Sequence, residues 1–191
     1  MNPSQSNTAS SPSTTPPNIV ARFVGDLERL ESRDGGTERA TMAALRCGLR
    51  HPDGIAVEMM PFVAPFLLQH ESTRDKHFFQ VAALFALHPQ STRAGSFASA
   101  FRALADNGSD SIEKRFQMLL ASRSDDLFRH LHQCVSLLKS DNLPVNWKRL
   151  LDDLFYGDWD SPGRELQLKW AREFYRRAHP TSTTASTSDL A

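Results

Sequence analysis

Basic side chains recur at helical spacing in this 191-residue sequence, and rows of cations are suited to binding phosphates. In residues 38–50, Arg39, Arg46 and Arg50 fall on one stripe along roughly 16 Å of helix axis. This length is enough to meet about two or three phosphates of a nucleic-acid backbone. An ordinary solvated helix face is the alternative interpretation, and spacing alone leaves both open.

A second basic stripe lies in residues 124–139. Arg129, His132, Ser136 and Lys139 share one arc of the predicted helix. The apolar residues fall on a separate arc, which we expect to be buried: Leu127, Leu131, Cys134, Val135 and Leu138. This stripe is therefore a second candidate for contact with a nucleic-acid backbone.

The stretch NGSDSIEKRFQMLL, residues 107–120, has the pattern of a helix start. Asp110 is suited to cap the helix, and Glu113 is spaced to reach back to the cap. Lys114 and Arg115 follow in about the first turn, where the helix dipole already places positive charge. Either the two acids neutralise these cations, or an anion binds at this helix end.

Residues with the spacing of a catalytic or metal site are scarce. His130 and His132 are two residues apart, so a helix points them to nearly opposite sides. The sequence contains no H-E-x-x-H, C-x-x-C or P-loop motif. An acidic group near the C-terminus is the one candidate for a metal-dependent nuclease: Asp152, Asp153, Asp158 and Asp160. A simpler interpretation places the last two in a turn and the first two on a polar helix face. We expect no enzyme activity, metal or cofactor.

Composition sets further bounds. The chain has 22 basic and 22 acidic residues, so any basic surface must be local. Two widely separated cysteines suit a reducing cytosol, and Cys134 is expected in the core. Neither a signal peptide nor an apolar run long enough for a membrane span is apparent. These features predict a cytoplasmic protein without membrane contact.

The elements that must position these residues are helices. Apolar spacing predicts them at 19–32, 38–50, 57–69, 75–87, 97–106, 111–122, 124–139, 146–155 and 164–178. Residues 1–18 and 179–191 are rich in Ser, Thr and Pro, which predicts disordered tails. The turn-forming residues around 108 predict a division into two small helical bundles, 19–107 and 108–178, joined in one compact all-α body.

Aromatic residues near the C-terminus are expected to pack rather than to stack on bases. Leu166, Trp170 and Phe174 recur at every fourth position, as in a buried helix stripe. Trp147 is expected to pack at a helix start.

Several of these stretches together resemble the CasB family, the small subunit of the type I-E CRISPR surveillance complex Cascade. The resemblance covers roughly residues 19–177. It is most specific from GSDSIEKRFQMLL through VSLLKSDNLPVNW, and it includes MAALRCGLRHP, FQVAALFALHP and the ending W-x-R-x-F.

The resemblance implies an all-helical, non-catalytic protein of antiviral defence. Its implied partners are the other Cascade Cas proteins, the CRISPR guide RNA, the displaced strand of target DNA, and a second copy of itself. Its implied role is to help hold the R-loop by RNA and DNA binding. In RNA-guided systems, base pairing with the guide RNA recognises the target sequence, so the protein need only contact nucleic-acid backbones.

The resemblance also indicates which candidate residues match basic positions of the family. Arg46, Arg50, Arg102, Lys114 and Arg115 match basic positions expected in the family, which favours phosphate contact at the helix start near residue 114. Two positions depart from the family. Cys47 follows Arg46 where relatives often have a second basic residue, and His132 stands where an arginine is expected. The helix face that carries His132 is then either less basic here or partly titrates near neutral pH. A helical adaptor that binds only protein, and the metal-dependent nuclease, remain the competing hypotheses.

Overall fold

The structure is a computed structural model that describes residues 19–33, 35–67, 74–106 and 110–176. The predicted tails, 1–18 and 179–191, lie outside these ranges. Within the described residues the fold is all-α, as predicted, and its β-type pairing is a single isolated bridge between Ser91 and Val145. In chain order the helices are α1 (Ile19–Ser32), α2 (Gly36–Arg46), η1 (Cys47–Arg50), η2 (Val57–Met59), α3 (Met60–Val63), η3 (Ala64–Phe66), α4 (Lys76–Leu87), α5 (Phe97–Asp106), α6 (Asp110–Ala121), α7 (Ser124–Ser140), α8 (Trp147–Tyr156) and α9 (Glu165–Tyr175).

Two predicted helices are interrupted. The helix expected at 57–69 is split into η2, α3 and η3, because Pro61 and Pro65 cannot donate backbone hydrogen bonds inside a continuous helix. The helix expected at 38–50 becomes the 3₁₀-helix η1 after Arg46. At Gly48 a β-carbon would lie 2.6 Å from the carbonyl oxygen of Gly54. Glycine is therefore required at this close approach of the backbone.

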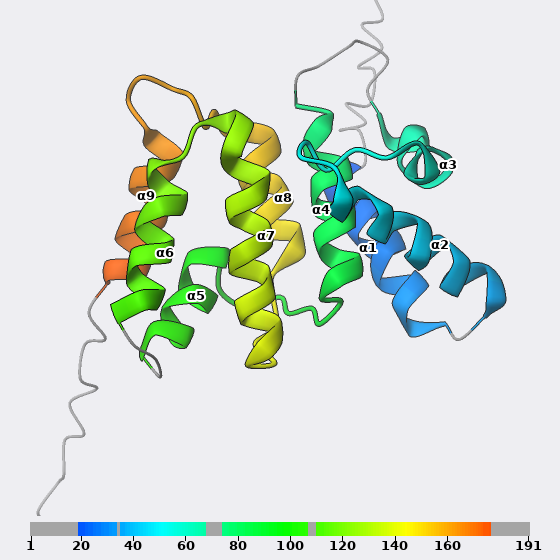
Figure 1. Cartoon of the computed structure of the whole chain (residues 1–191), viewed down its shortest axis with the longest axis horizontal. Helices are drawn as coiled ribbons and strands as arrows, with labels where there is room; N and C mark the ends of the chain where they lie inside the picture. The colour runs from blue at the N-terminus through cyan, green and yellow to red at the C-terminus, as the bar shows by residue number, and fades with distance from the viewer. Residues whose placement is uncertain (1–18, 34, 68–73, 107–109, 177–191) are drawn as a thin grey trace, which may run out of the picture.

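The helices form two halves that share one core. Figure 1 shows α1, α2, α3 and α4 in one half, and α5, α6, α7 and α9 in the other, with α8 next to α4. Aromatic pairs join α4 to α8: Phe78 packs on Phe155 with ring centroids 5.1 Å apart, and Phe85 on Trp147 at 5.8 Å. Nearly every residue of α4 is buried, so this helix carries much of the contact between the halves.

The predicted boundary between bundles, near residue 108, falls on residues 107–109, which lie outside the described part of the chain. Helix α5, which the prediction placed in the N-terminal bundle, packs against α9, α6 and α7. Helix α8 packs against both α4 and α1. The division into 19–107 and 108–178 stays a prediction about folding units.

The predicted core residues are buried. All five apolar residues of the α7 arc are at most 1% exposed. Leu166, Trp170 and Phe174 are also buried, and Trp147 is fully buried at the start of α8. Burial raises the pKa of the Cys134 thiol to about 12, as expected for a core cysteine.

Among the described residues, no helix combines the length and apolar character that crossing a lipid bilayer requires.

Candidate nucleic-acid interface

Lys114, Arg115 and Lys139 lie on two neighbouring antiparallel helices. Only residues 122–123 separate α6 from α7, and Figure 1 shows α6 beginning near the level where α7 ends. All three cations are exposed, and within the described ranges none of them forms an ion pair. These positive charges are therefore available to an external anion.

The start of α6 differs in detail from the expected cap. The helix already includes Asp110, whose side chain lies outside the described part. The Glu113 carboxylate accepts hydrogen bonds from Gln117 Nε2 (3.1 Å) and from the Tyr175 hydroxyl (3.0 Å). Glu113 thus ties α6 to α9, and its charge is directed at those partners rather than at Lys114 and Arg115.

The first predicted stripe is carried by α2 and η1. Arg39, Arg46 and Arg50 are all exposed. Arg46 Nε donates to the carbonyl oxygen of Ala86 (2.9 Å) in the last turn of α4, where helix carbonyls lack intrahelical partners. Arg50 Nη2 contacts Cys47 Sγ at 3.0 Å. These contacts fix where the two guanidinium groups emerge from the surface.

The two predicted stripes meet at a surface pocket of about 290 Å³ between η1 and α7. Arg50, Arg129 and His132 line it, although Arg50 and Arg129 are 79 positions apart in the sequence. Asp125 and Asp126 line it as well, and Arg129 Nη2 pairs with Asp126 Oδ1 at 2.9 Å. The pocket is therefore nearly neutral, and its acids lie at the start of α7.

Histidine adds little positive charge at this place near neutral pH. Burial lowers the pKa of His132 below its ordinary value of 6.5. The pKa of His130 is also lowered, first by burial and then by the charge of Arg129. Ring nitrogens here are mainly neutral at pH 7, so Arg50, Arg129 and Lys139 must supply the charge on this part of the surface.

Arg102 has several partners inside the molecule. Its Nη1 donates to the carbonyl oxygen of Phe174 (3.1 Å) and to that of Arg176, and its Nε lies 3.4 Å from Asp106 Oδ2. The guanidinium thus caps the C-terminal end of α9, where a cation also complements the helix dipole. Nucleic-acid contact by Arg102 stays a prediction that this geometry disfavours.

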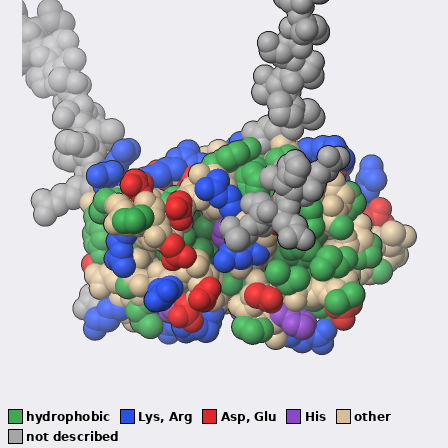
Figure 2. All heavy atoms as spheres, turned by 90° about the horizontal axis from the view of Figure 1, so that it is seen from above, with side chains coloured by type: hydrophobic (Ala, Val, Ile, Leu, Met, Phe, Trp, Pro, Cys, Tyr) green, Lys and Arg blue, Asp and Glu red, His purple; other side chains and the backbone are tan. Residues whose placement is uncertain are grey.

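Figure 2 shows the upper surface of the molecule, as it is seen from above Figure 1. Lys and Arg side chains are intermixed there with Asp and Glu, and hydrophobic side chains gather over one half. Val57 and Met60, on η2 and α3, are among the exposed hydrophobic residues. The upper surface of the molecule is therefore not uniformly basic.

We define the basic face as the surface formed by α2–η1, α6 and α7. Figure 1 shows α6 in front of α9 and α7 in front of α8, on the near side of the molecule. The cations of the basic face are Arg39, Arg46, Arg50, Lys114, Arg115, Arg129 and Lys139.

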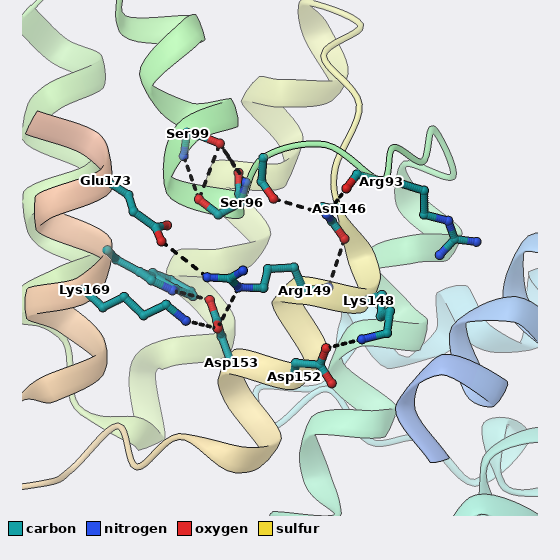
Figure 3. Close-up of polar contacts among 12 residues, drawn as sticks. Arg93, Ser96, Ser99, Asn146, Lys148, Arg149, Asp152, Asp153, Lys169 and Glu173 are labelled. Atoms are coloured by element: carbon teal, nitrogen blue, oxygen red, sulfur yellow. Dashed lines mark hydrogen bonds and ion pairs between the residues drawn. The ribbon is translucent and has the colours of Figure 1, made fainter. Parts of the chain in front are cut away.

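The acidic group near the C-terminus is engaged in structural contacts. Asp152 pairs with Lys148 at 2.6 Å, as fits a polar helix face. The prediction for Asp153 was wrong, because this residue is only 6% exposed. Its Oδ2 accepts from Trp170 Nε1 (2.8 Å) and its Oδ1 from Lys169 Nζ (2.5 Å), with Arg149 Nε at 3.3 Å (Figure 3).

Asp158 and Asp160 lie in the predicted turn. Asp158 Oδ1 accepts from the backbone N–H of Asp160 (3.1 Å). Asp160 Oδ1 accepts from the backbone N–H of Ser124 (3.1 Å) and thereby caps α7 from another segment. Within the described part of the chain, no group of three His, Cys, Asp or Glu residues is arranged to hold a metal ion.

Sequence reasoning missed the polar contacts that join α8 to α9 and to the segment before α5. Arg149 reaches both Asp153 (3.3 Å) and Glu173 (3.4 Å). The spacing of Arg149 and Asp153, four residues apart on one helix, was a readable signal. Nothing in the sequence alone indicated that this pair faces inward onto α9.

Comparisons with known proteins show the family to which the chain belongs. A sequence model of the family described as CRISPR-associated protein Cse2 matches residues 41–175. The chain is 38% identical to a CRISPR-associated protein Cse2 of Thermus thermophilus over 159 residues, 81% of this chain and 88% of the relative. It superposes with a TM-score of 0.71 on a crystal structure of a Cse2-family CRISPR-associated protein from the same organism, at 35% identity, covering 83% of this chain and 98% of that one.

A chain of a CRISPR RNA-guided surveillance complex is also similar. It superposes with a TM-score of 0.66 at 27% identity, covering 83% of this chain and 92% of that chain. The family model and the curated relative together cover most of the described helices. This chain belongs to the Cse2 family of CRISPR-associated proteins.

Proposed function

We propose that this protein is the non-catalytic small subunit of a type I-E CRISPR RNA-guided surveillance complex, in which its basic face binds nucleic-acid backbone. Family membership and the similarity to a chain of such a complex support the assembly role. The proposed partners are the other Cas proteins, the guide RNA, target DNA and a second copy of the chain.

One observation carries the nucleic-acid part of the proposal: Lys114, Arg115 and Lys139 are exposed and have no ion-pair partner in the described ranges. The start of α6 adds the positive end of a helix dipole to two of them. Arg50 lines a pocket shared with α7, and Arg46 lies on the same α2–η1 segment, so this segment adds cations from the second half of the molecule. Cations in such an array suit a sequence-independent contact with phosphates.

The proposed role is to stabilise the R-loop and its displaced strand. Forming an R-loop exchanges one duplex for another of similar stability, so modest backbone contacts shift the balance. Since guide pairing supplies sequence recognition, a face of cations without base-reading groups is sufficient for this subunit.

The direct test is fluorescence anisotropy of labelled single- and double-stranded DNA and of RNA over a salt series. The wild-type chain and Lys114→Ala/Arg115→Ala are compared, first with EDTA and then with magnesium. We expect metal-independent binding that weakens steeply with salt. The double variant lowers the salt slope by about 1.4 for single strands, because each lost phosphate contact contributes about 0.7.

Arg102→Ala is the matched control, because its guanidinium is occupied within the molecule. We expect it to leave the salt slope unchanged. Absence of binding at low salt, or affinity that does not respond to salt, would favour the protein-only adaptor instead. Cleavage that requires magnesium would favour the nuclease.

A further inference from the structure

The segment between α4 and α5, residues 88–96, connects the two halves of the molecule, and we call it the linker. It pairs with the segment that precedes α8. The backbone N–H of Val145 donates to the carbonyl of Gln90 (3.0 Å), and the N–H of Thr92 donates to the carbonyl of Val145 (3.1 Å). The linker is therefore attached by backbone pairing to a residue two positions before α8.

Asn146 reinforces this pairing with its side chain. It is only 8% exposed, and its amide has partners at both ends. Oδ1 accepts from the backbone N–H of Arg149 (3.0 Å) and caps α8, while Nδ2 donates to the carbonyls of Arg93 (3.0 Å) and Gly95 (3.1 Å). Figure 3 shows this side chain between α8 and the segment that carries Arg93. A carboxamide is suited to this site because it has an acceptor for the helix N–H and two donors for the linker carbonyls.

The linker is held on its other side by α1. Arg93 Nη2 pairs with Glu28 Oε2 at 2.5 Å, and Ser91 Oγ donates to Glu28 Oε1 at 2.5 Å. Glu28 belongs to the half that carries α2 and η1. Asn146 belongs to the chain between α7 and α8. The linker thus contacts α1, in the half that carries α2 and η1, and also Asn146, which follows α7 in the chain.

We infer that Asn146 is a positioning residue that holds the arginines of α2–η1 in register with the cations of α6 and α7. This inference rests on the proposed function, because register matters only if one nucleic-acid strand contacts both parts of the face. Loss of the two donated hydrogen bonds leaves the carbonyls of Arg93 and Gly95 without their side-chain donor at the edge of a surface pocket. The linker is then held to this side by the backbone pairing at Val145 and by Trp147 Nε1, which donates to the carbonyl of Gln90 (3.3 Å), and we expect it to open more often.

The test uses Asn146→Asp. A carboxylate still accepts the Arg149 N–H and is a good helix cap, but it donates nothing to the linker and repels its carbonyls. The matched control is Asn142→Asp, which makes the same charge change at an exposed position four residues earlier. Both variants are measured well below their melting temperatures, so that a loss of folded protein does not contribute.

Two readouts are taken on the full chain. Hydrogen exchange followed by mass spectrometry reports the amides of Thr92 and Val145, and anisotropy over a salt series with single-stranded DNA reports how many cations bind together. We expect Asn146→Asp to speed exchange in both segments and to reduce the salt slope by about 1.4, as if Arg46 and Arg50 no longer contacted the strand. Asn142→Asp leaves exchange in both segments unchanged, and it gives the effect on binding of one added carboxylate near Lys139, against which the salt slope of Asn146→Asp is compared.

An unchanged salt slope in folded Asn146→Asp overturns the inference and leaves the proposed function standing, because a residue that acts only on stability does not alter the number of cations engaged. Unchanged exchange shows that the Asn146 side chain does not hold the linker against α8, and it also overturns the inference. If the wild-type chain shows no salt-dependent binding, the proposed function fails and the positioning role fails with it.

Discussion

At the scale of single residues, the most consequential side chain outside the basic face is Asp153. Its carboxylate is 4% exposed and is surrounded by the donors of Lys169, Trp170 and Arg149. A buried carboxylate with several charged and neutral donors joins two helices strongly, because removing it leaves those donors unpaired. Asp153 therefore acts as a structural link between α8 and α9.

We expect Asp153→Ala to lower the free energy of unfolding by about 2 kcal/mol, measured by urea denaturation. This is less than the cost of breaking a fully buried ion pair, because Lys169 and Arg149 stay partly in contact with water. The matched control is Asp152→Ala, which removes a neighbouring pair nearer the surface and costs less than about 1 kcal/mol. Equal effects of the two substitutions would contradict this account of Asp153.

Residue identity predicted much of the candidate interface but not its charge balance. Spacing along single helices made the cations of α2–η1 and α7 candidates, and the pattern of a helix start did so for Lys114 and Arg115 of α6; their contact with nucleic acid stays a prediction. It did not indicate that Arg102 caps the end of α9, which lies 72 residues later in the chain. The pair of Asp126 and Arg129 is compatible with their spacing of three residues, but the spacing alone did not establish it. Partners that arrive from another helix depend on packing, which spacing does not specify.

At the scale of elements, the start of α4 is fixed by a buried polar group. His77 Nδ1 and Gln80 Oε1 are 2.9 Å apart, and Gln80 Nε2 donates to the carbonyl of Asp53 (3.0 Å) in the loop after η1. His77 is 7% exposed, and burial lowers its pKa to about 4. Between about pH 4 and 6.5, the His77 ring is therefore mainly neutral in the folded protein, whereas it is mainly protonated in the unfolded chain.

This difference predicts that stability falls as the pH is lowered from about 6.5 to 4. In that window the unfolded state binds a proton at His77 that the native state does not, so the free energy of unfolding decreases with acid. The contribution reaches about 3 kcal/mol at the acid end. Urea denaturation at several pH values checks it, with His77→Gln expected to flatten the dependence.

The control for this measurement is His51→Gln, which changes an exposed histidine in the same region. We expect it to retain the wild-type pH dependence. A His77→Gln variant whose stability still falls as steeply as the wild type between these pH values would show that other groups are responsible.

Helix positions were predictable where apolar spacing was regular, as in α1, α5, α7 and α9. They were less predictable where the backbone has a local reason to deviate. Gly48 permits a contact with Gly54 that no helical pattern reveals, and it lies in the 3₁₀ turn that follows α2. Two prolines split the apolar stretch near residue 61, where the pattern suggested one longer helix.

At the scale of the whole molecule, the two predicted stripes are neighbours only because the two halves meet. Arg50 and Arg129 line one pocket through the packing of α4 against α7 and α8. The sequence indicated both stripes separately and had no means of placing them together. The chain has equal numbers of acidic and basic residues, so the positive charge of the basic face is local.

The central claim is that this face stabilises an R-loop inside the surveillance complex. The measurement that tests it most directly is the lifetime of the R-loop formed by a complex reconstituted from the host's Cas proteins and guide RNA. It compares the wild-type subunit with Lys114→Ala/Arg115→Ala/Lys139→Ala. We predict normal assembly and an R-loop lifetime shortened by about ten-fold or more at moderate salt, because about three phosphate contacts are lost. Normal assembly with an unchanged lifetime and an unchanged salt dependence would contradict the claim.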